Sequence, residues 1–503
     1  MDAEHFLMER ALRGCARRGE RRVAIYGAGA HTRRMGPALC EPPLEIVGIV
    51  DDDPMRIGSR MWNFPVISPE EARDVDAVII SSDSAETAIW ERCAGLRGAG
   101  VEVIRLYGPN DAGDVPQQIA VWPPVTTPTE WGDLAARLAW YLAPAARGIE
   151  SVFVPQVGLT APSDASPIKA DSVPSYLIRP SGSPLDDRIR FVDPESLDDL
   201  DPDLVLIWND RDDARGLARP GRAVVSVDPI SRRYSSMAFG SLANRVMGGD
   251  PAAYELSKKR FARFVSESRA DRTYVFGTGP SLARAREMHF DDGVCLVCNS
   301  IVADDELMAR LRPALVAFAD PVFHMGPSSY AAEFRDHLVR SVRAHGCWIA
   351  IPMRDFRVLS HHLPDDVAGR LIGVPTMSGA VPRLDLTERF ATSETTNILT
   401  MLLLPIAATI SRWIGVVGCD GRPIDQNEYF WSHDRTAQLP DRMNDARRAH
   451  PGFFEIDYRD YYAEHCATVE RWLDEAARRG IRVESLTPSF IPALAERGMA
   501  CAG

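Results

Sequence analysis

The feature that most limits the possible folds is an apolar run that ends in a glycine turn and continues as a helix. It occurs at 274–282, with the sequence YVFGTGPSL, and a similar run, RRVAIYGAGAH, begins at Arg21. A strand, a tight turn and a helix in this order begin a βαβ unit, in which helices connect parallel strands. The chain is therefore predicted to be α/β, with Rossmann-like parallel sheets.

The length of the chain predicts several domains, because 503 residues exceed one ordinary core. We expect a Rossmann-like domain at 1–112, a second α/β domain at 113–245 and a catalytic domain at 246–503. Residues 111–122 are expected to form a polar linker. No catalytic or binding motif is recognised in the second domain. It is therefore interpreted as a scaffold or oligomer surface, or as an acceptor-binding lobe.

Charge and composition exclude some classes of protein. The formal net charge is −13, which argues against a general nucleic-acid binder. The N-terminal residues lack the apolar core of a signal peptide, and the nine cysteines show no dense framework. The longest apolar stretch, 397–410, is too short to span a bilayer and contains Pro405, so a buried helix is expected. These features predict a cytoplasmic protein without a membrane span.

Cys295 and Cys298 form a C-x-x-C within the apolar run VCLVC. No second C-x-x-C or histidine pair accompanies them, so they are predicted to be buried thiols of a strand. No metal site is expected in the chain.

The first glycine turn contains Gly27 and Gly29, which would bring a helix N-terminus towards a phosphate. Asp51 follows the next strand, where an acid could bind a ribose hydroxyl. The dinucleotide fingerprint is incomplete, because Thr32 stands at its third glycine. The segments IYGAGAH and GIVDDDP resemble the N-terminal domain of sugar O-acyltransferases of the sialic-acid type. Two interpretations stay open, a nucleotide or nucleotide-sugar site and a structural Rossmann unit without a ligand.

The second glycine turn has a clear physical logic. Gly277 and Gly279 can take a positive φ and expose backbone N–H groups. Pro280 suits the first turn of a helix, and Ser281 adds a hydroxyl at the same helix end. The helix dipole favours an anion there, so a phosphate site is expected.

Five motifs then follow one another in order: GTGPSL, VCNS, FADPVF, ATSETTNI and IGVVGCDG. In this order they resemble bacterial sialyltransferases of the Campylobacter type. They also resemble 6-hydroxymethylpterin diphosphokinase-like proteins and the motility accessory factors that modify flagellin. The resemblance covers about residues 272–490. It implies a GT-A-like sialyltransferase-type domain that binds a cytidine nucleotide and needs no obligatory cofactor or metal.

The resemblance also implies roles for individual residues. The turn residues would hold the phosphate and ribose: Gly277, Thr278, Gly279, Pro280 and Ser281. Asn299 would hydrogen-bond the nucleotide, and Asp320 marks the next polar strand end. Thr392 and Ser393 would lie near the donor sugar.

A second group of residues would serve the leaving phosphate. Asp420 ends a strand, and Tyr429 matches a tyrosine that stabilises the leaving phosphate in the sialyltransferases. Arg422 stands about where a second tyrosine would be, and its guanidinium could neutralise the same phosphate.

Transfer of a sugar also needs a base for the acceptor hydroxyl, and histidine is suited to that role near neutral pH. His433, His450 and His465 follow Asp420. Comparison with the sialyltransferases favours His465 and then His450, whereas comparison with the diphosphokinase-like branch favours His433. Each of the three also has a purely structural interpretation.

These observations lead to an expected function with two alternatives. The expected function is an inverting glycosyltransferase that moves an acidic, nonulosonic-type sugar from a CMP-activated donor to a surface polysaccharide or glycoconjugate. The first alternative is a pyrophosphokinase that uses ATP and Mg²⁺, the latter bound through Asp420, Asp425 and Asp434. The second alternative is a non-catalytic nucleotide-sugar binding protein.

Overall fold

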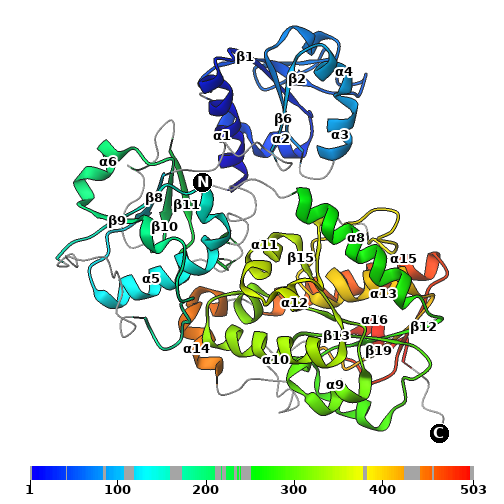
Figure 1. Ribbon diagram of the computed structural model, residues 1–503. Coiled ribbons are helices and arrows are strands. Elements are labelled where there is room, and N and C mark those ends of the chain that lie inside the picture. The colour runs from blue at the N-terminus through cyan, green and yellow to red at the C-terminus, as the bar shows by residue number, and fades with distance from the viewer. Residues whose placement is uncertain are drawn as a thin grey trace. The chain divides into compact units, whose positions relative to one another are not determined.

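The computed structural model shows a mixed α/β protein with several parallel sheets (Figure 1). The residues that it describes are 3–40, 42–82, 86–106, 118–158, 173–209, 217, 222–231, 235–236, 238–239, 251–377, 382–423, 442–455 and 458–498. Their contacts group the chain into two units. The first comprises Met1–Val173 and Pro180–Pro251, and the second comprises Pro174–Arg179 and Ala252–Gly503.

The first sheet belongs to the first unit and has the strand order β3-β4-β2-β1-β5-β6. Its strands are β1 (Arg22–Tyr26), β2 (Glu45–Val50), β3 (Arg60–Met61), β4 (Phe64–Ile67), β5 (Ala77–Ile80) and β6 (Glu102–Arg105). All pairs are parallel except β3 with β4. The helices with it are α1 (Ala3–Arg18), α2 (Ala30–Arg34), α3 (Glu86–Arg92) and α4 (Ala94–Gly98). Alternate residues of β1 enter two separate apolar clusters, one with α1 and one with α3 and α4, so the sheet is covered on both faces.

The second sheet, also in the first unit, is entirely parallel and has the order β11-β10-β7-β8-β9. Its strands are β7 (Gln118–Trp122), β8 (Ser151–Pro155), β9 (Ile189–Val192), β10 (Leu204–Ile207) and β11 (Ala223–Ser226). Helix α5 (Pro128–Tyr141) begins after its N-cap Thr127, whose side chain accepts a hydrogen bond from the Glu130 N–H. The prediction of a linker at 111–122 was wrong for its last five residues, because Gln118–Trp122 form β7, the central strand of this sheet.

The third sheet forms the centre of the second unit. Its order is β16-β15-β14-β13-β12-β19-β20, and all its pairs are parallel. The strands are β12 (Arg272–Phe276), β13 (Val294–Cys298), β14 (Leu315–Ala317), β15 (Trp348–Pro352), β16 (Leu371–Val374), β19 (Trp413–Val417) and β20 (Arg482–Ser485). A small parallel pair lies beside it, β17 (Thr376–Met377) with β18 (Thr392–Ser393).

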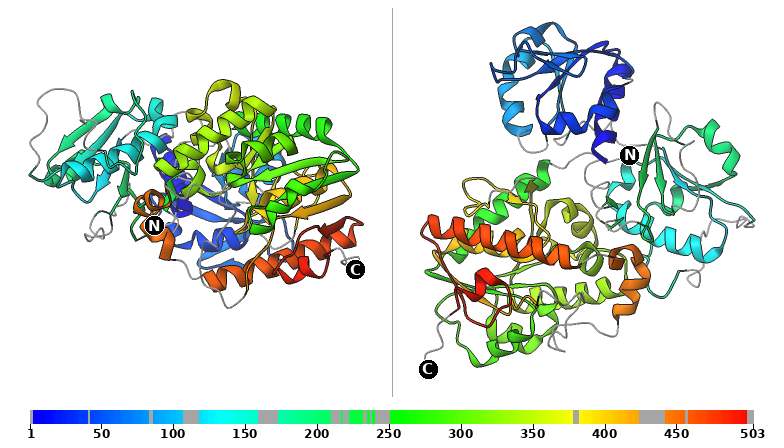
Figure 2. Two further views of the ribbon diagram at one scale, coloured as in Figure 1. Left: turned by 90° about the horizontal axis from the view of Figure 1, so that it is seen from below. Right: turned by 180° about the vertical axis from the view of Figure 1, so that it is seen from behind.

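Helices cover both faces of the third sheet (Figures 1 and 2). One face packs against η9 (Pro280–Glu287), α9 (Asp305–Leu311), α10 (Ser329–His345), α11 (Met353–His362) and α12 (Asp365–Ala368). The other face packs against α8 (Pro251–Ser268), α13 (Leu404–Ile410), α15 (Tyr458–Arg478) and α16 (Pro492–Ala495). Cys295 belongs to the first of these apolar cores and Cys298 to the second, so the two thiols point to opposite faces. The prediction of buried strand thiols is confirmed, and this pair cannot hold one metal ion together.

The long apolar stretch forms a π-helical turn, η12 (Leu399–Leu403), followed by α13, and every residue of both is buried. The expected buried helix is thus confirmed. Among the described residues there is no helix with the length and apolar character needed to cross a membrane.

A short strap from the chain between β8 and β9 belongs to the second unit. Leu177 forms an antiparallel bridge with Ser328, just before α10, and is 3% exposed. The Ile178 N–H donates to the Pro327 carbonyl, and the Ser329 N–H donates to the Tyr176 carbonyl. Residues 174–179, which lie within the expected second domain, therefore group with the C-terminal sheet.

Candidate functional site

The candidate site lies at the carboxyl edge of the third sheet. The chain leaves β12 in one direction through β13, β14, β15 and β16, and then returns to the other side of β12 to form β19 and β20. The order therefore reverses between β12 and β19. In open parallel sheets, ligands bind outside the carboxyl ends of the strands at such a switch point. The GTGPS turn follows β12 and the sequence Gly-Cys-Asp-Gly follows β19, so both motifs lie at this position.

The two turns interlock through their backbones. The Gly277 N–H donates to the Val417 carbonyl and the Gly279 N–H donates to the Gly418 carbonyl, each at 2.8 Å. A Cβ on Gly277 would lie 2.7 Å from the Cys419 Sγ, and a Cβ on Gly279 would lie 2.1 Å from an oxygen of Asp420. Glycine is required here because the two strand ends approach closely.

This arrangement corrects the expected role of the glycines. Neither Gly277 nor Gly279 has a positive φ, whereas Gly418 does, at 68°. Their N–H groups are already bonded to β19, so they do not form the exposed donors that were expected for a phosphate.

Ser281 and Asp420 form the polar contact at the centre of the switch point. The Ser281 hydroxyl donates to the Asp420 carboxylate at 2.8 Å, and the Ser281 N–H donates to the same group at 3.1 Å. The carboxylate thus takes the place at the start of η9 that was expected for an anionic ligand. Burial raises the pKa of Asp420, and the bonds from Ser281 oppose that rise. Pro280 is exposed beside this contact, and Thr278 is half-buried.

Asn299 lies at the carboxyl end of the neighbouring strand β13. The pairing of Phe276 with Val297 places it beside the glycine turn. Its backbone is left-handed, with a φ of 49°, and its Oδ1 atom is buried without a hydrogen-bond partner in the described part of the chain. A strained residue with an unsatisfied buried acceptor is characteristic of a binding position.

Asp320 follows β14 and begins η11 (Pro321–Met325). Its Oδ1 accepts hydrogen bonds from the N–H groups of Val322, at 2.8 Å, and Phe323, at 3.3 Å. Burial nevertheless raises the pKa of this carboxyl to about 6, with the charge of Arg354 opposing. The expected strand-end position is therefore occupied, and its carboxyl caps a π-helical turn.

An arginine that sequence reasoning missed lies at the end of β15. Arg354 is 10% exposed, and its Nη2 donates to the Ala319 carbonyl at 3.2 Å. Its Nε donates to the Asp355 carboxylate at 3.0 Å, and its Nη1 lies 3.5 Å from the Glu394 carboxylate. Burial raises the pKa of Asp355 to about 6. No motif marks Arg354, so only its position directly after an apolar strand could have indicated it.

Thr392 and Ser393 form β18. Thr392 is fully buried and its hydroxyl donates to the Met401 carbonyl at 2.7 Å, which fixes this strand to η12. Thr392 therefore has a structural contact where a sugar contact was expected, whereas Ser393 is partly exposed beside Glu394.

Arg422, Tyr462 and His465 connect the end of β19 to α15. The Arg422 N–H donates to the Tyr462 hydroxyl at 3.0 Å, and its guanidinium lies 5.1 Å from the centre of that ring. His465 is one turn further along the helix, 6% exposed, with its Nδ1 buried and without a partner among the described residues. Burial lowers the pKa of His465 to about 4, so the imidazole is neutral at pH 7.

Of the other two candidate bases, His450 and His433, the structure describes only His450. His450 ends α14 (Met443–Ala449) and is 1% exposed. His433 and Tyr429 lie outside the described residues, as do Asp425 and Asp434 of the magnesium alternative. Within the described ranges, no group of three or more His, Cys, Asp or Glu side chains is arranged to hold a metal ion.

The first sheet has its own switch point, between β1 and β5. Gly27 has a φ of 118°, and a Cβ there would lie 3.0 Å from the Ser81 carbonyl, whereas Gly29 has nothing within 4 Å of its Cβ position. The two carboxylate oxygens of Asp51 accept the N–H groups of Ala28 and Asp53, at 2.8 and 2.9 Å. Asp51 thus fixes the glycine turn, and the expected ribose contact of this residue stays a prediction.

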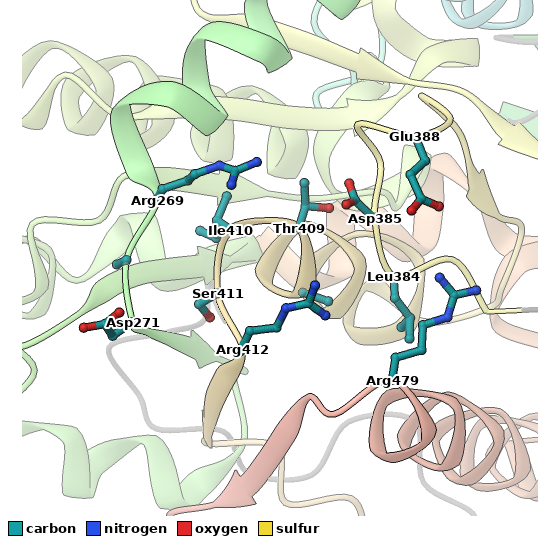
Figure 3. Close-up of a pocket in the computed structure, with 12 residues that line it drawn as sticks. Arg269, Asp271, Leu384, Asp385, Glu388, Thr409, Ile410, Ser411, Arg412 and Arg479 are labelled. Atoms are coloured by element: carbon teal, nitrogen blue, oxygen red, sulfur yellow. The ribbon is translucent and has the colours of Figure 1, made fainter.

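A separate hollow of about 680 Å³ lies at the opposite, amino edge of the third sheet (Figure 3). Side chains from the junctions before β12, β19 and β20 surround it: Arg269, Asp271, Arg412 and Arg479, together with Asp385 and Glu388. The hydroxyls of Thr409 and Ser411 in its wall already donate to backbone carbonyls. Its charges are mixed and it lies away from the carboxyl ends of the strands, so we assign no function to it.

Taken together, the fold and the switch point define an α/β protein with parallel sheets and polar residues gathered at the carboxyl ends of the third. A family model described as C2185-like, N-terminal matches residues 19–100, which contain β1 to β5 of the first sheet. No curated protein matches the chain.

Proposed function

We propose that the second unit is a sialyltransferase-like, GT-A-like glycosyltransferase that uses a CMP-activated acidic sugar. The observation that carries the proposal is the position of Asn299 at the switch point. It provides a strained backbone and a buried, unsatisfied acceptor next to the glycine turn. The exocyclic amine of a cytosine or a ribose hydroxyl would supply the missing donor. The ordered motifs from GTGPSL to IGVVGCDG add the family resemblance to this geometry.

The proposed reaction is a direct displacement at the anomeric carbon of the sugar. A base removes the proton of the acceptor hydroxyl, whose oxygen forms the new bond as the bond to the CMP phosphate breaks. Arg422 would face the leaving phosphate, because it follows β19 at the switch point. His465 is the best placed of the described candidate bases, since α15 is bonded through Tyr462 to the backbone of Arg422.

The neutral imidazole of His465 is in the correct protonation state for a base, but its low pKa makes it a weak one. A pKa of about 4 keeps the imidazole neutral at pH 7, and a low pKa also weakens its pull on a proton. An anionic donor bound nearby would raise that pKa, because negative charge favours the imidazolium. We therefore propose that donor binding precedes activation of the acceptor.

Nucleotide binding by the full-length protein tests the first step. Calorimetry with CMP, UDP, ADP and GDP should show CMP as the tightest ligand. Asn299→Gly should weaken CMP binding about tenfold or more, because glycine keeps the left-handed backbone and removes the amide. Arg312→Gly is the matched control, since Arg312 is also left-handed, with a φ of 41°, but is exposed at the end of α9. Preference for ADP or GDP, or unchanged CMP binding by Asn299→Gly, would refute the assignment.

Turnover tests the second step. Release of CMP from a CMP-nonulosonate, with glycan acceptors supplied, should continue in EDTA because the proposed chemistry needs no metal. A magnesium requirement with ATP would instead support pyrophosphoryl transfer. Tight CMP binding without turnover by any acceptor would support a nucleotide-sugar binding protein.

A further inference from the structure

Arg354 has the features of a ligand-binding arginine rather than of a completed buried ion pair. A buried guanidinium normally has each of its N–H groups paired, because an unpaired buried donor is costly. Here Nε and Nη2 have good acceptors, on Asp355 and Ala319. The Nη1 atom is buried without a hydrogen bond in the described chain, and the Glu394 oxygen 3.5 Å away is outside hydrogen-bond geometry.

The position of this guanidinium fits the candidate site. Arg354 is the second residue of α11, which follows β15 directly, and its Nη2 bond to Ala319 turns the side chain towards the end of β14. The next strand is β13, which carries Asn299, and neighbouring strands lie about 4.8 Å apart. Arg354 and Asn299 therefore follow strands β15 and β13, which lie roughly two strand spacings, or about 10 Å, apart. One ligand that lies across the ends of β13, β14 and β15 would therefore reach both residues.

Glu394 differs from the other carboxylates around Arg354. Asp355 is 3% exposed, and Asp320 is held by two backbone N–H groups. Glu394 has a side chain that is 48% exposed and makes the long, misaligned contact. Moving this one carboxylate into water breaks no well-formed hydrogen bond of Arg354.

We propose that Arg354 recognises the carboxylate of an acidic sugar donor, and that Glu394 occupies the place of that carboxylate until the donor displaces it. This inference rests on the proposed function and specifies the substrate group that selects the donor. Arginine pairs with a carboxylate through two parallel N–H bonds, which a misaligned Glu394 does not achieve. The exchange replaces one carboxylate by another, so the negative charge beside Asp320 and Asp355 does not increase.

The test compares CMP with CMP-N-acetylneuraminate, since only the second carries the sugar carboxylate. The measured quantity is the ratio of their dissociation constants for the full-length protein. In Arg354→Gln the advantage of the acidic donor over CMP should fall about tenfold, while CMP binding stays within about twofold. In Glu394→Gln that advantage should rise about threefold or more, because the competing carboxylate is gone.

Two controls and two outcomes separate the claims. Arg343→Gln removes the exposed ion pair between Arg343 of α10 and Asp366 of α12. Glu388→Gln neutralises a carboxylate at the amino edge of the sheet. Both substitutions should leave the ratio of dissociation constants unchanged. Because Glu394 is half-exposed, Glu394→Gln remains a fair test even if Arg354→Gln does not fold. If wild-type protein does not bind CMP, the proposed function and this inference both fail. If CMP binds and Glu394→Gln leaves the ratio unchanged, this inference alone is overturned.

Discussion

Gly29 and Gly279 hold the same place in two similar G-x-G turns, and the structure predicts a much larger loss of stability when Gly279 is changed to alanine than when Gly29 is. Each precedes a helix as its N-cap residue with an extended backbone, with φ values of −98° and −71°. A Cβ on Gly29 meets nothing within 4 Å. A Cβ on Gly279 would lie 2.1 Å from the Asp420 Oδ2 and 2.8 Å from the Gly418 carbonyl oxygen.

The magnitude for Gly279→Ala follows from these contacts. The Asp420 carboxylate must swing away, which breaks the bonds from the Ser281 hydroxyl and N–H. Hydrogen bonds to a charged group contribute about 1.5–3 kcal/mol each, so about 3 kcal/mol is a conservative loss. The Gly418 carbonyl belongs to the backbone and cannot move as easily. Gly29→Ala shares only the small N-cap preference for glycine, which costs below about 1 kcal/mol.

Calorimetry and hydrogen exchange on the full-length protein measure both effects. In a domain of this size, about 3 kcal/mol lowers the midpoint of unfolding by roughly 6–12 °C. Because a chain of several domains does not unfold in one step, exchange of peptides 272–287 and 413–423 locates the loss. Adding Asp420→Ala to Gly279→Ala should recover part of the loss, because the side-chain clash is gone. Equal effects of Gly29→Ala and Gly279→Ala would refute the interlocked-turn interpretation.

Three further outcomes are expected. The pKa of Asp355 is about 6 rather than 3.8, so the stability that its protonated form contributes is complete below about pH 4 and is lost as the pH rises towards 6. Asp355→Asn should flatten that decline in denaturant titrations at pH 4, 5, 6 and 7, and an unchanged slope would contradict the raised pKa. His465→Gln should lower kcat about a hundredfold with CMP binding kept, whereas a purely structural histidine would change stability and leave kcat intact. Leu177→Ala should cost about 2–3 kcal/mol and increase hydrogen exchange at 327–329, unless the strap contributes no packing.

The sequence predicted the fold well where strand, turn and helix follow one another. The glycine turns after β1 and β12 marked the first strands of two sheets, and the region 113–245 contains a parallel sheet, as its α/β prediction implies. The central strand β7 was missed because it directly follows a stretch with Gly and Pro that was interpreted as a polar linker. Its neighbours in the sheet, β8 and β10, come from distant parts of the chain, so no local pattern identifies it.

The sequence predicted which polar residues lie at the strand ends, but not the contacts that they make. The motifs placed Asn299, Asp320 and Asp420 at the strand ends where the structure has them. Local sequence could not show that Asp420 would bond to Ser281, because that contact joins residues 139 positions apart. Arg354 was missed because no motif marks it, and its contacts with Ala319 and Glu394 join separate segments of the chain.

The burial of His324 was also not predicted from the sequence. This side chain is 4% exposed, and its ring centre lies 4.4 Å from that of Phe334. Burial lowers its pKa to about 3. Only the packing of η11 against α10 creates that environment, so the FADPVF motif next to it gave no indication.

The strap at 174–179 limits how the chain can be divided. A fragment that begins at residue 252 would contain every strand of the third sheet and still lack the segment that binds at 327–329. Such a fragment would leave exposed the apolar surface that Leu177 covers and the backbone groups that Tyr176 and Ile178 pair. A synthetic peptide with the sequence of the strap should therefore bind to the fragment in trans. The C-terminal unit is, in this sense, assembled from two separate pieces of the chain.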